Sequence, residues 1–153
     1  MIYQKLTNHI IMEKLNDILF YNMDKAIRTY RNYAQKRLRD HGYKITIDQW
    51  LIIKAILENP GIMQQELAEI VFKDNASVTR IIEILVKSGY LQREINPKDR
   101  RKTILKVTAE GKLIIEKVQV LVLENRQIAL GGIENSTLQT TNEVLNAIAK
   151  NCK

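Results

Sequence analysis

Apolar residues recur at steps of three and four over much of the chain, and this spacing is typical of amphipathic helices. The first such stretch runs from Met12 to about Asp40, which predicts a helix of about 29 residues. With a rise of about 1.5 Å per residue it would be about 43 Å long, whereas a compact globule of this chain length is only roughly 40 Å across. One subunit therefore cannot cover the whole apolar stripe, which favours a partner chain.

Capping signals mark the end of this helix and the start of the next. Gly42 is expected to end the first helix, because glycine commonly follows the last helical turn. Thr46 and Gln49 have the spacing of a capping box, which predicts a second helix that stops at Pro60-Gly61. Trp50 lies in the apolar stripe of this second helix and is expected in the core.

Two shorter helices are predicted next, at 64–71 and 75–88. Asp74 or Asn75 can cap the second of them, and Gly89 is expected to stop it. The segment from 62 to 89 therefore has the order helix, turn, helix.

After Gly89 the pattern changes from that of a helix to that of a strand. Residues 90–95 and 103–107 are rich in β-branched and apolar side chains, which predicts two strands. Between them, 96–102 starts with Asn-Pro and continues with concentrated charge, which predicts a basic turn. Thr108 is then expected to cap a long helix.

The C-terminal segment predicts one more helix, in which Ser136 and Gln139 form a capping box. The predicted fold class is mainly α with a small β-hairpin wing, a winged helix-turn-helix flanked by N- and C-terminal helices. The last helix carries a heptad-like seam suited to packing on another helix, made of Leu138, Thr141, Leu145, Ile148 and Cys152.

Composition narrows the class of protein. An apolar share of 45% and a charged share of 27% are ordinary for a soluble globular chain. The single cysteine excludes an intrachain disulfide and favours a reducing compartment. Apolar runs reach only four or five residues, so we expect a cytoplasmic protein without a membrane partner.

The parts needed for enzymatic chemistry are missing. The histidines are His9 and His41, and neither forms a metal-ligand spacing with Cys152. The sequence also has no glycine-rich phosphate loop and no nucleophile elbow. We therefore expect no enzyme activity, no metal and no cofactor. His41 is expected to interact with helix C-terminal carbonyls, and Cys152 is expected to be inert.

The helix predicted at 75–88 has one apolar and one polar face. Val78, Ile81, Ile82 and Leu85 would face the core. Serine, threonine, asparagine and arginine side chains can bind base edges and phosphates in the major groove, although any capped surface helix has a similar polar face. The expected DNA-binding residues of this recognition helix are Asn75, Ser77, Thr79 and Arg80.

Several sequence fragments follow one another at a characteristic spacing: Gln65-Glu66-Leu67-Ala68, Ser77-Val78-Thr79-Arg80-Ile81-Ile82, Leu85-Val86-Lys87-Ser88-Gly89-Tyr90-Leu91, Asp99-Arg100-Arg101 and Val107-Thr108-Ala109-Glu110-Gly111. Each fragment alone occurs in many proteins, but the order of the whole set is specific. The ordered set resembles the MarR family (multiple antibiotic resistance regulators) of transcription factors over nearly the whole chain. One departure is Met63, where the family usually has Ser or Thr as a cap.

The resemblance implies a homodimer whose subunits each present one winged module to double-stranded DNA. It implies dimerisation regions at 1–45 and 112–153 and a DNA-binding domain at 46–111. It also implies that Arg101 reaches the minor groove and that Asp99 pairs with a nearby arginine to hold the wing tip. A solvated turn is the alternative. The expected DNA-binding residues of the wing are Lys98, Asp99, Arg100, Arg101 and Lys102.

The leading hypothesis is a sequence-specific transcriptional regulator, in this family most often a repressor, on a near-palindromic operator. The family usually releases DNA when a small aromatic or anionic ligand binds. Tyr30, Tyr33 and Arg37 are candidate contacts for it, with ordinary interface packing as the alternative. Two other functions stay open: a winged-helix module that binds an acidic protein, and a non-specific chromosome-coating protein.

The net charge of +7 does not by itself locate a DNA surface. Residues 62–111 hold 9 positive and 7 negative side chains, a net of only +2. Within them, 93–106 holds six positive and two negative side chains, whereas 25–44 holds seven positive and one negative. The charge distribution therefore favours the wing as a DNA contact. The basic residues of the first helix would contact a dimer partner, a ligand or flanking phosphates.

Overall fold

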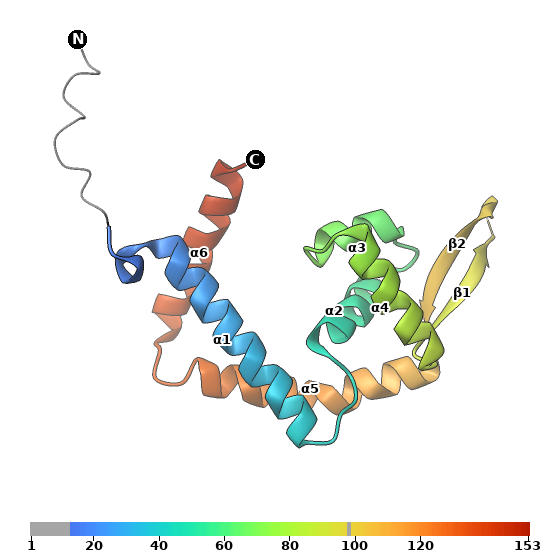
Figure 1. The fold of residues 1–153 in the computed structure, drawn as a ribbon, viewed down its shortest axis with the longest axis horizontal. Coiled ribbons are helices and arrows are strands. Elements are labelled where there is room, and N and C mark those ends of the chain that lie inside the picture. The colour runs from blue at the N-terminus through green and yellow to red at the C-terminus, as the bar shows by residue number, and fades with distance from the viewer. Residues whose placement is uncertain (1–12, 98) are drawn as a thin grey trace, which may run out of the picture. The chain divides into compact units, whose positions relative to one another are not determined.

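The computed structural model describes residues 13–97 and 99–153, except for the side chains of residues 101 and 102. Contacts divide the chain into two compact units, Met1–Ile47 and Asp48–Lys153, and each is described by itself. No helix in the described ranges is both long enough and apolar enough to cross a bilayer. The elements (Figure 1) are a 3-10 turn at Leu15–Asp17, α1 Leu19–Asp40, α2 Ile47–Glu58, α3 Gln64–Ile70, α4 Asn75–Lys87, β1 Leu91–Asn96, β2 Asp99–Val107, α5 Ala109–Ala129 and α6 Asn135–Asn151.

The first unit contains α1, which begins at Leu19 rather than at Met12. Ile18 has extended backbone (φ −80°, ψ 115°), so the prediction of one continuous helix was wrong; Met12 itself lies outside the described residues. The side-chain amide of Asn22 donates to the carbonyl of Asn16 across the break (2.7 Å). Such a side-chain bond competes with the helical ladder, and periodicity does not detect it. The 22 residues of α1 make a helix about 33 Å long.

The C-terminus of α1 ends as predicted. Gly42 has φ +77°, and the N–H of Tyr43 donates to the carbonyl of Leu38 (3.0 Å), which closes the last turn. The Nδ1–H of His41 donates to the carbonyl of Arg37 (2.8 Å). The expectation that His41 satisfies helix carbonyls is therefore confirmed.

The second unit is built around α2, whose buried residues lie on several sides of the helix. Trp50 is buried, as predicted from its apolar stripe. The helices α3 and α4 pack on each other, and α4 also contacts β1. The described core of this unit includes the fully buried residues Ile52, Ile53, Leu67, Val78, Ile82, Leu85, Leu91 and Val118.

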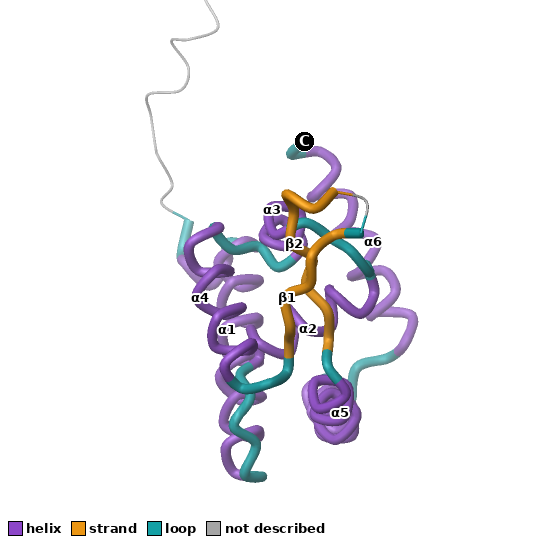
Figure 2. Tube along the Cα trace, turned by 90° about the vertical axis from the view of Figure 1, so that its right-hand side faces the viewer, coloured by secondary structure: helices purple, strands orange, loops and turns teal. Residues whose placement is uncertain are grey.

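The hairpin has a longer second strand than the sequence predicted (Figure 2). The strands pair regularly from Leu91 opposite Val107 to Ile95 opposite Thr103, and then Asn96 lies opposite Asp99. Residues 100–102 thus form a bulge inside β2 rather than part of a seven-residue turn. The prediction of a turn over 96–102 was wrong because a run of charged residues is compatible with extended backbone and with a bulge.

The last two helices differ in how they begin. Thr108 caps α5 as predicted, because its Oγ1 accepts a hydrogen bond from the N–H of Gly111 (3.0 Å). In contrast, Glu134 occupies the N-cap of α6 and makes no side-chain cap bond. Ser136 lies inside the first turn of α6, so the predicted capping box with Gln139 was wrong. Sequence spacing alone does not decide which polar residue becomes the cap.

Candidate nucleic-acid interface

The recognition helix α4 begins at a side-chain cap. The carboxylate of Asp74 accepts hydrogen bonds from the N–H (2.8 Å) and the Oγ (2.7 Å) of Ser77. Both bonds lower the pKa of Asp74 below its ordinary value of 3.8, and the bond from the Ser77 hydroxyl has the larger effect. Ser77, predicted as a DNA contact, therefore already serves the start of its own helix.

Thr79 is also engaged within the chain. Its Oγ1 donates to the carbonyl of Asn75 (2.8 Å) and accepts from the side-chain amide of Gln64 (2.6 Å). This second bond joins the first turn of α3 to α4 and fixes the angle at which α4 is presented. Sequence analysis did not identify Gln64, because only the tertiary fold brings residues fifteen positions apart together.

The remaining two predicted contacts on α4 point to solvent. Asn75 and Arg80 are exposed, whereas Val78, Ile82 and Leu85 are buried, so the predicted division of the helix into two faces is confirmed for these residues. Of the four candidate side chains on this helix, the structure leaves Asn75 and Arg80 exposed and places Ser77 and Thr79 in internal hydrogen bonds.

At the start of α3, Met63 makes no side-chain cap bond, as expected for a thioether. Glu66 compensates, because its carboxylate accepts the N–H of Met63 (3.0 Å). One half of a capping box is thus present without a serine or threonine.

The turn between α3 and α4 contains a residue that sequence analysis missed. Phe72 has φ 54° and is 94% exposed. The adjacent Lys73 pairs with Asp48 at the start of α2 (2.9 Å). No sequence pattern signals an exposed phenylalanine in a left-handed conformation, since glycine or asparagine is usual there.

The wing presents fewer free charges than the sequence count suggests. Lys106 pairs with Glu94 across the hairpin (3.3 Å to each carboxylate oxygen), and Glu94 also accepts from Gln92 (2.6 Å). Arg93 and Arg100 are exposed. Lys98 lies outside the described residues, as do the side chains of residues 101 and 102; Asp99 is half-buried.

The base of the wing is fastened to the end of α4. The Oγ1 of Thr108 donates to the carbonyl of Gly89 (2.6 Å), and its N–H donates to the carbonyl of Tyr90 (3.1 Å). A Cβ at Gly111 would collide with the backbone oxygen of Tyr90 and lie 2.8 Å from Cγ1 of Val107. The Thr-x-x-Gly spacing is thus explained, because the threonine makes the bonds and the glycine leaves room for them.

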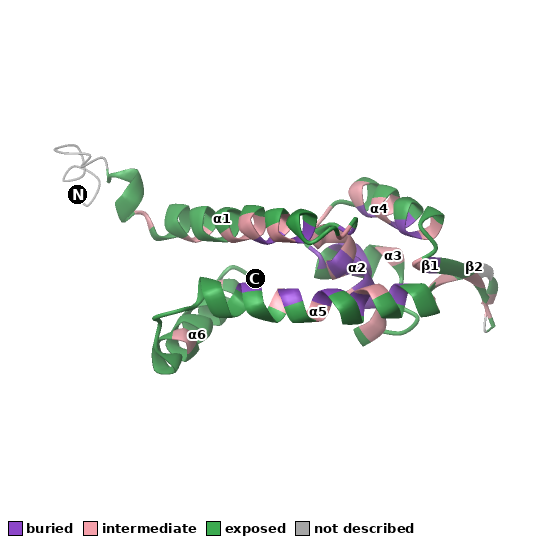
Figure 3. Cartoon of the chain, turned by 90° about the horizontal axis from the view of Figure 1, so that it is seen from below, coloured by how far each residue is buried: buried purple, intermediate pink, exposed green. Residues whose placement is uncertain are grey.

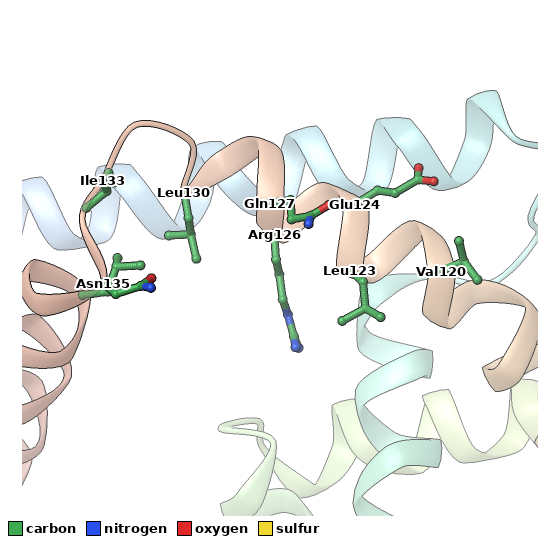
Figure 4. A pocket seen from close by; sticks show the side chains of 9 residues that line it. Val120, Leu123, Glu124, Arg126, Gln127, Leu130, Ile133 and Asn135 are labelled. Atoms are coloured by element: carbon green, nitrogen blue, oxygen red, sulfur yellow. The ribbon is translucent and has the colours of Figure 1, made fainter.

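The proposed ligand contacts lie on the first unit. Tyr30, Tyr33 and Arg37 are half-buried, and steps of three and four place them on one side of α1. The second unit has its own hollow of about 640 Å³ between α5 and α6. Figure 4 shows Leu123, Arg126 and Leu130 projecting to the same side of α5. The hollow is lined by Val120, Leu123, Glu124, Arg126, Gln127, Leu130, Ile133, Asn135 and Leu138.

Comparison with known proteins agrees with this architecture. The family model of the MarR family matches residues 45–103, which include α2, α3, α4, β1 and part of β2. An uncharacterised HTH-type transcriptional regulator of Bacillus subtilis, YybA, is 30% identical over 141 residues, which cover 90% of this chain and 89% of the relative.

Two solved structures share the fold at lower identity. One is BpsR of Bordetella bronchiseptica, whose DNA binding is regulated by 6-hydroxynicotinic acid; it has a TM-score of 0.80, 19% identity, and coverage of 90% of this chain and 96% of that chain. The other is CouR of Rhodococcus jostii bound to p-coumaroyl-CoA, with a TM-score of 0.78, 19% identity, and coverage of 90% and 95%. BpsR and CouR show that the fold is shared. The family model and the relative from Bacillus subtilis place the chain in the MarR family, as a DNA-binding transcriptional regulator rather than an enzyme.

Proposed function

We propose that this regulator acts in the cytoplasm as a homodimeric repressor that binds a near-palindromic operator and is released by a small aromatic or anionic ligand. In a two-fold dimer, two copies of α4 would enter successive major grooves about 34 Å apart. Asn75 and Arg80 would contact base edges or phosphates, and the basic wing would contact the adjacent minor groove.

The apolar surface of α5 and α6 carries the dimer proposal. No residue of α6 is buried in the single chain, and Val120, Leu123 and Ile128 of α5 are each at least half exposed. Contiguous apolar patches of this kind mark interaction sites on soluble proteins. In the first unit, Leu19 and Phe20 of α1 are exposed in the same way, which adds a second surface for a partner subunit.

The ligand proposal is supported by BpsR and CouR, whose ligands are aromatic and carry negative charge. On this chain, Tyr30 and Tyr33 could stack on such a ligand, and Arg37 could bind its carboxylate. A ligand releases DNA only if it binds one arrangement of the two DNA-binding modules better than the other. The α5–α6 hollow is the alternative position for it, because it combines an apolar lining with Arg126.

A gel-shift series with the promoter of the protein's own gene tests the central proposal. Specific retardation should persist in excess random DNA. If each subunit neutralises about four phosphates, log K should fall against log salt with a slope near −7. Equal competition by random DNA would indicate a chromosome-coating protein. The absence of a shift would indicate a protein-interaction module.

The ligand is tested on the same complex with 6-hydroxynicotinic acid as the probe. We expect it to weaken operator binding by the wild type and to have a smaller effect on Arg37→Ala. Arg126→Ala is the matched variant for the α5–α6 hollow. Equal responses of wild type and Arg37→Ala would overturn the assignment to α1.

A further inference from the structure

Phe72 combines two features that the fold does not explain. It is the one non-glycine residue with positive φ in the part of the chain that the structure describes, at 54°. A bulky side chain in this conformation is an outlier, since glycine or asparagine usually follows a helix there. The residue is 94% exposed, so its ring is not packed within the chain. A strained residue that does not stabilise its own fold indicates a contact with another molecule.

The turn holds the ring in a defined place. The N–H of Phe72 donates to the carbonyl of Glu69 (3.2 Å), and the N–H of Lys73 donates to that of Ala68 (3.0 Å). The ammonium of Lys73 also pairs with Asp48 of α2 (2.9 Å), and both side chains are about 30% exposed or less. These bonds fasten the turn to two helices, so the ring projects from a fixed support.

That support adjoins the N-terminus of α4, the end that would enter DNA in the proposed complex. Phe72 stands three residues before Asn75, the first residue of α4. Helices of this class meet base edges through their N-terminal residues. In the proposed complex the preceding turn would therefore lie at the rim of the groove, where a nucleotide offers two apolar surfaces, the deoxyribose and the C5-methyl of thymine. Phenylalanine is among the side chains that contact this methyl group.

We propose that Phe72 is a DNA-contacting residue whose ring packs on one nucleotide at the edge of each half-site. The contact is to the deoxyribose or to a thymine methyl. This proposal rests on the proposed operator binding and deepens it, because it assigns an apolar contact to a surface otherwise identified by charge and hydrogen-bonding groups.

Phe72→Asn and Phe72→Gly test the proposal, because both residues accept the left-handed conformation. The probe is a duplex selected by the wild-type protein from a random library, and binding is measured by fluorescence anisotropy. We expect Kd to rise about tenfold in both variants. Their Tm should equal the wild-type value or exceed it by about 2–4 °C, because the strain is removed. Leu113→Ala, which trims another exposed apolar side chain, should leave Kd unchanged.

Salt dependence gives a second signature. Loss of an apolar contact leaves the slope of log K against log salt unchanged, whereas loss of a phosphate contact reduces it by about one. Replacing single thymines of the duplex by uracil locates the contact. If the ring lies on a thymine methyl group, replacing that one thymine should weaken DNA binding by the wild type but not by Phe72→Asn. If the ring lies on a deoxyribose, no thymine replacement should show this difference between the two proteins.

The outcomes against the proposal are distinct. Wild-type Kd values in both variants would overturn it, as would a fall in Tm that accompanies the weaker binding. A dimer that dissociates in light scattering would assign the ring to the partner subunit instead of DNA. If the wild type enriches no duplex, the proposed operator binding fails; variants that match a binding wild type overturn only the role of Phe72.

Discussion

The helices α4 and α6 are both amphipathic, with 13 and 17 residues, yet only α4 buries its apolar face within the chain. Val78, Ile82 and Leu85 are fully buried, whereas α6 has no buried residue and Leu145 is 37% exposed. Figure 3 shows this contrast along the ribbon. Helical periodicity predicts that a face will be covered, but it does not say which chain will cover it.

The largest expected effect on stability comes from shortening a side chain on the buried face of α4. Leu85→Ala should lower the free energy of unfolding by about 3 kcal/mol, because it removes a buried side chain and leaves a cavity. Urea denaturation measures the change. In dilute protein the matched variant Leu145→Ala should cost less than about 1 kcal/mol. An equal loss of unfolding free energy in the two variants would show that α4 and α6 do not differ in how far the chain covers their apolar faces.

A charge on the exposed face should affect association instead of folding. Leu145→Glu should weaken the proposed dimer about 100-fold, since a carboxylate would be buried at the interface. Sedimentation velocity measures the association, and circular dichroism should show an unchanged helix content. If the variant dimerises like the wild type, α6 is not part of the interface.

The wing gives the next effect. Arg101→Ala should weaken operator binding at least tenfold through loss of the minor-groove contact, while light scattering shows an intact dimer. Lys112→Ala, which removes an exposed cation at the start of α5, is the control. An unchanged Kd for Arg101→Ala would contradict the assignment of this residue to the minor groove.

The smallest effect concerns the cap of α4 and its pH dependence. The hydrogen bonds from Ser77 lower the pKa of Asp74 in the folded chain, so the cap stabilises fully above the ordinary value of 3.8 and is lost as the pH falls through the lower folded value. Asp74→Ala should therefore have a lower Tm than the wild type at about pH 6, and the two should converge in stronger acid. A difference that stays constant with pH would show that the carboxylate is not the stabilising group.

Much of the DNA-binding unit could be predicted because its signals are local. As helix caps, Asp74 and Thr108 accept hydrogen bonds from N–H groups three positions further on, and Gly89 directly follows the C-cap residue of α4; each stands where the sequence places it. The start of α1 and the cap of α6 were predicted wrongly, since several polar residues compete for each end and packing selects among them.

The site itself was less predictable, because its residues depend on tertiary contacts. The bond between Gln64 and Thr79 requires α3 to lie against α4, and it removes Thr79 from the fully exposed face. Phe72 opposes the local preference of its position, so a sequence rule would assign glycine there. The bulge at 100–102 depends on strand register rather than on the charge of its residues.

The bond from Thr108 to the carbonyl of Gly89 has a mechanical consequence. It joins the root of the wing to the residues that follow α4, so that in the proposed complex the two parts would move together and would not engage separate grooves independently. An effector that tilts α5 would then withdraw helix and wing together. Each half-site would be released in one step, and loss of the Thr108 bond would alter groove contacts that Thr108 itself does not make.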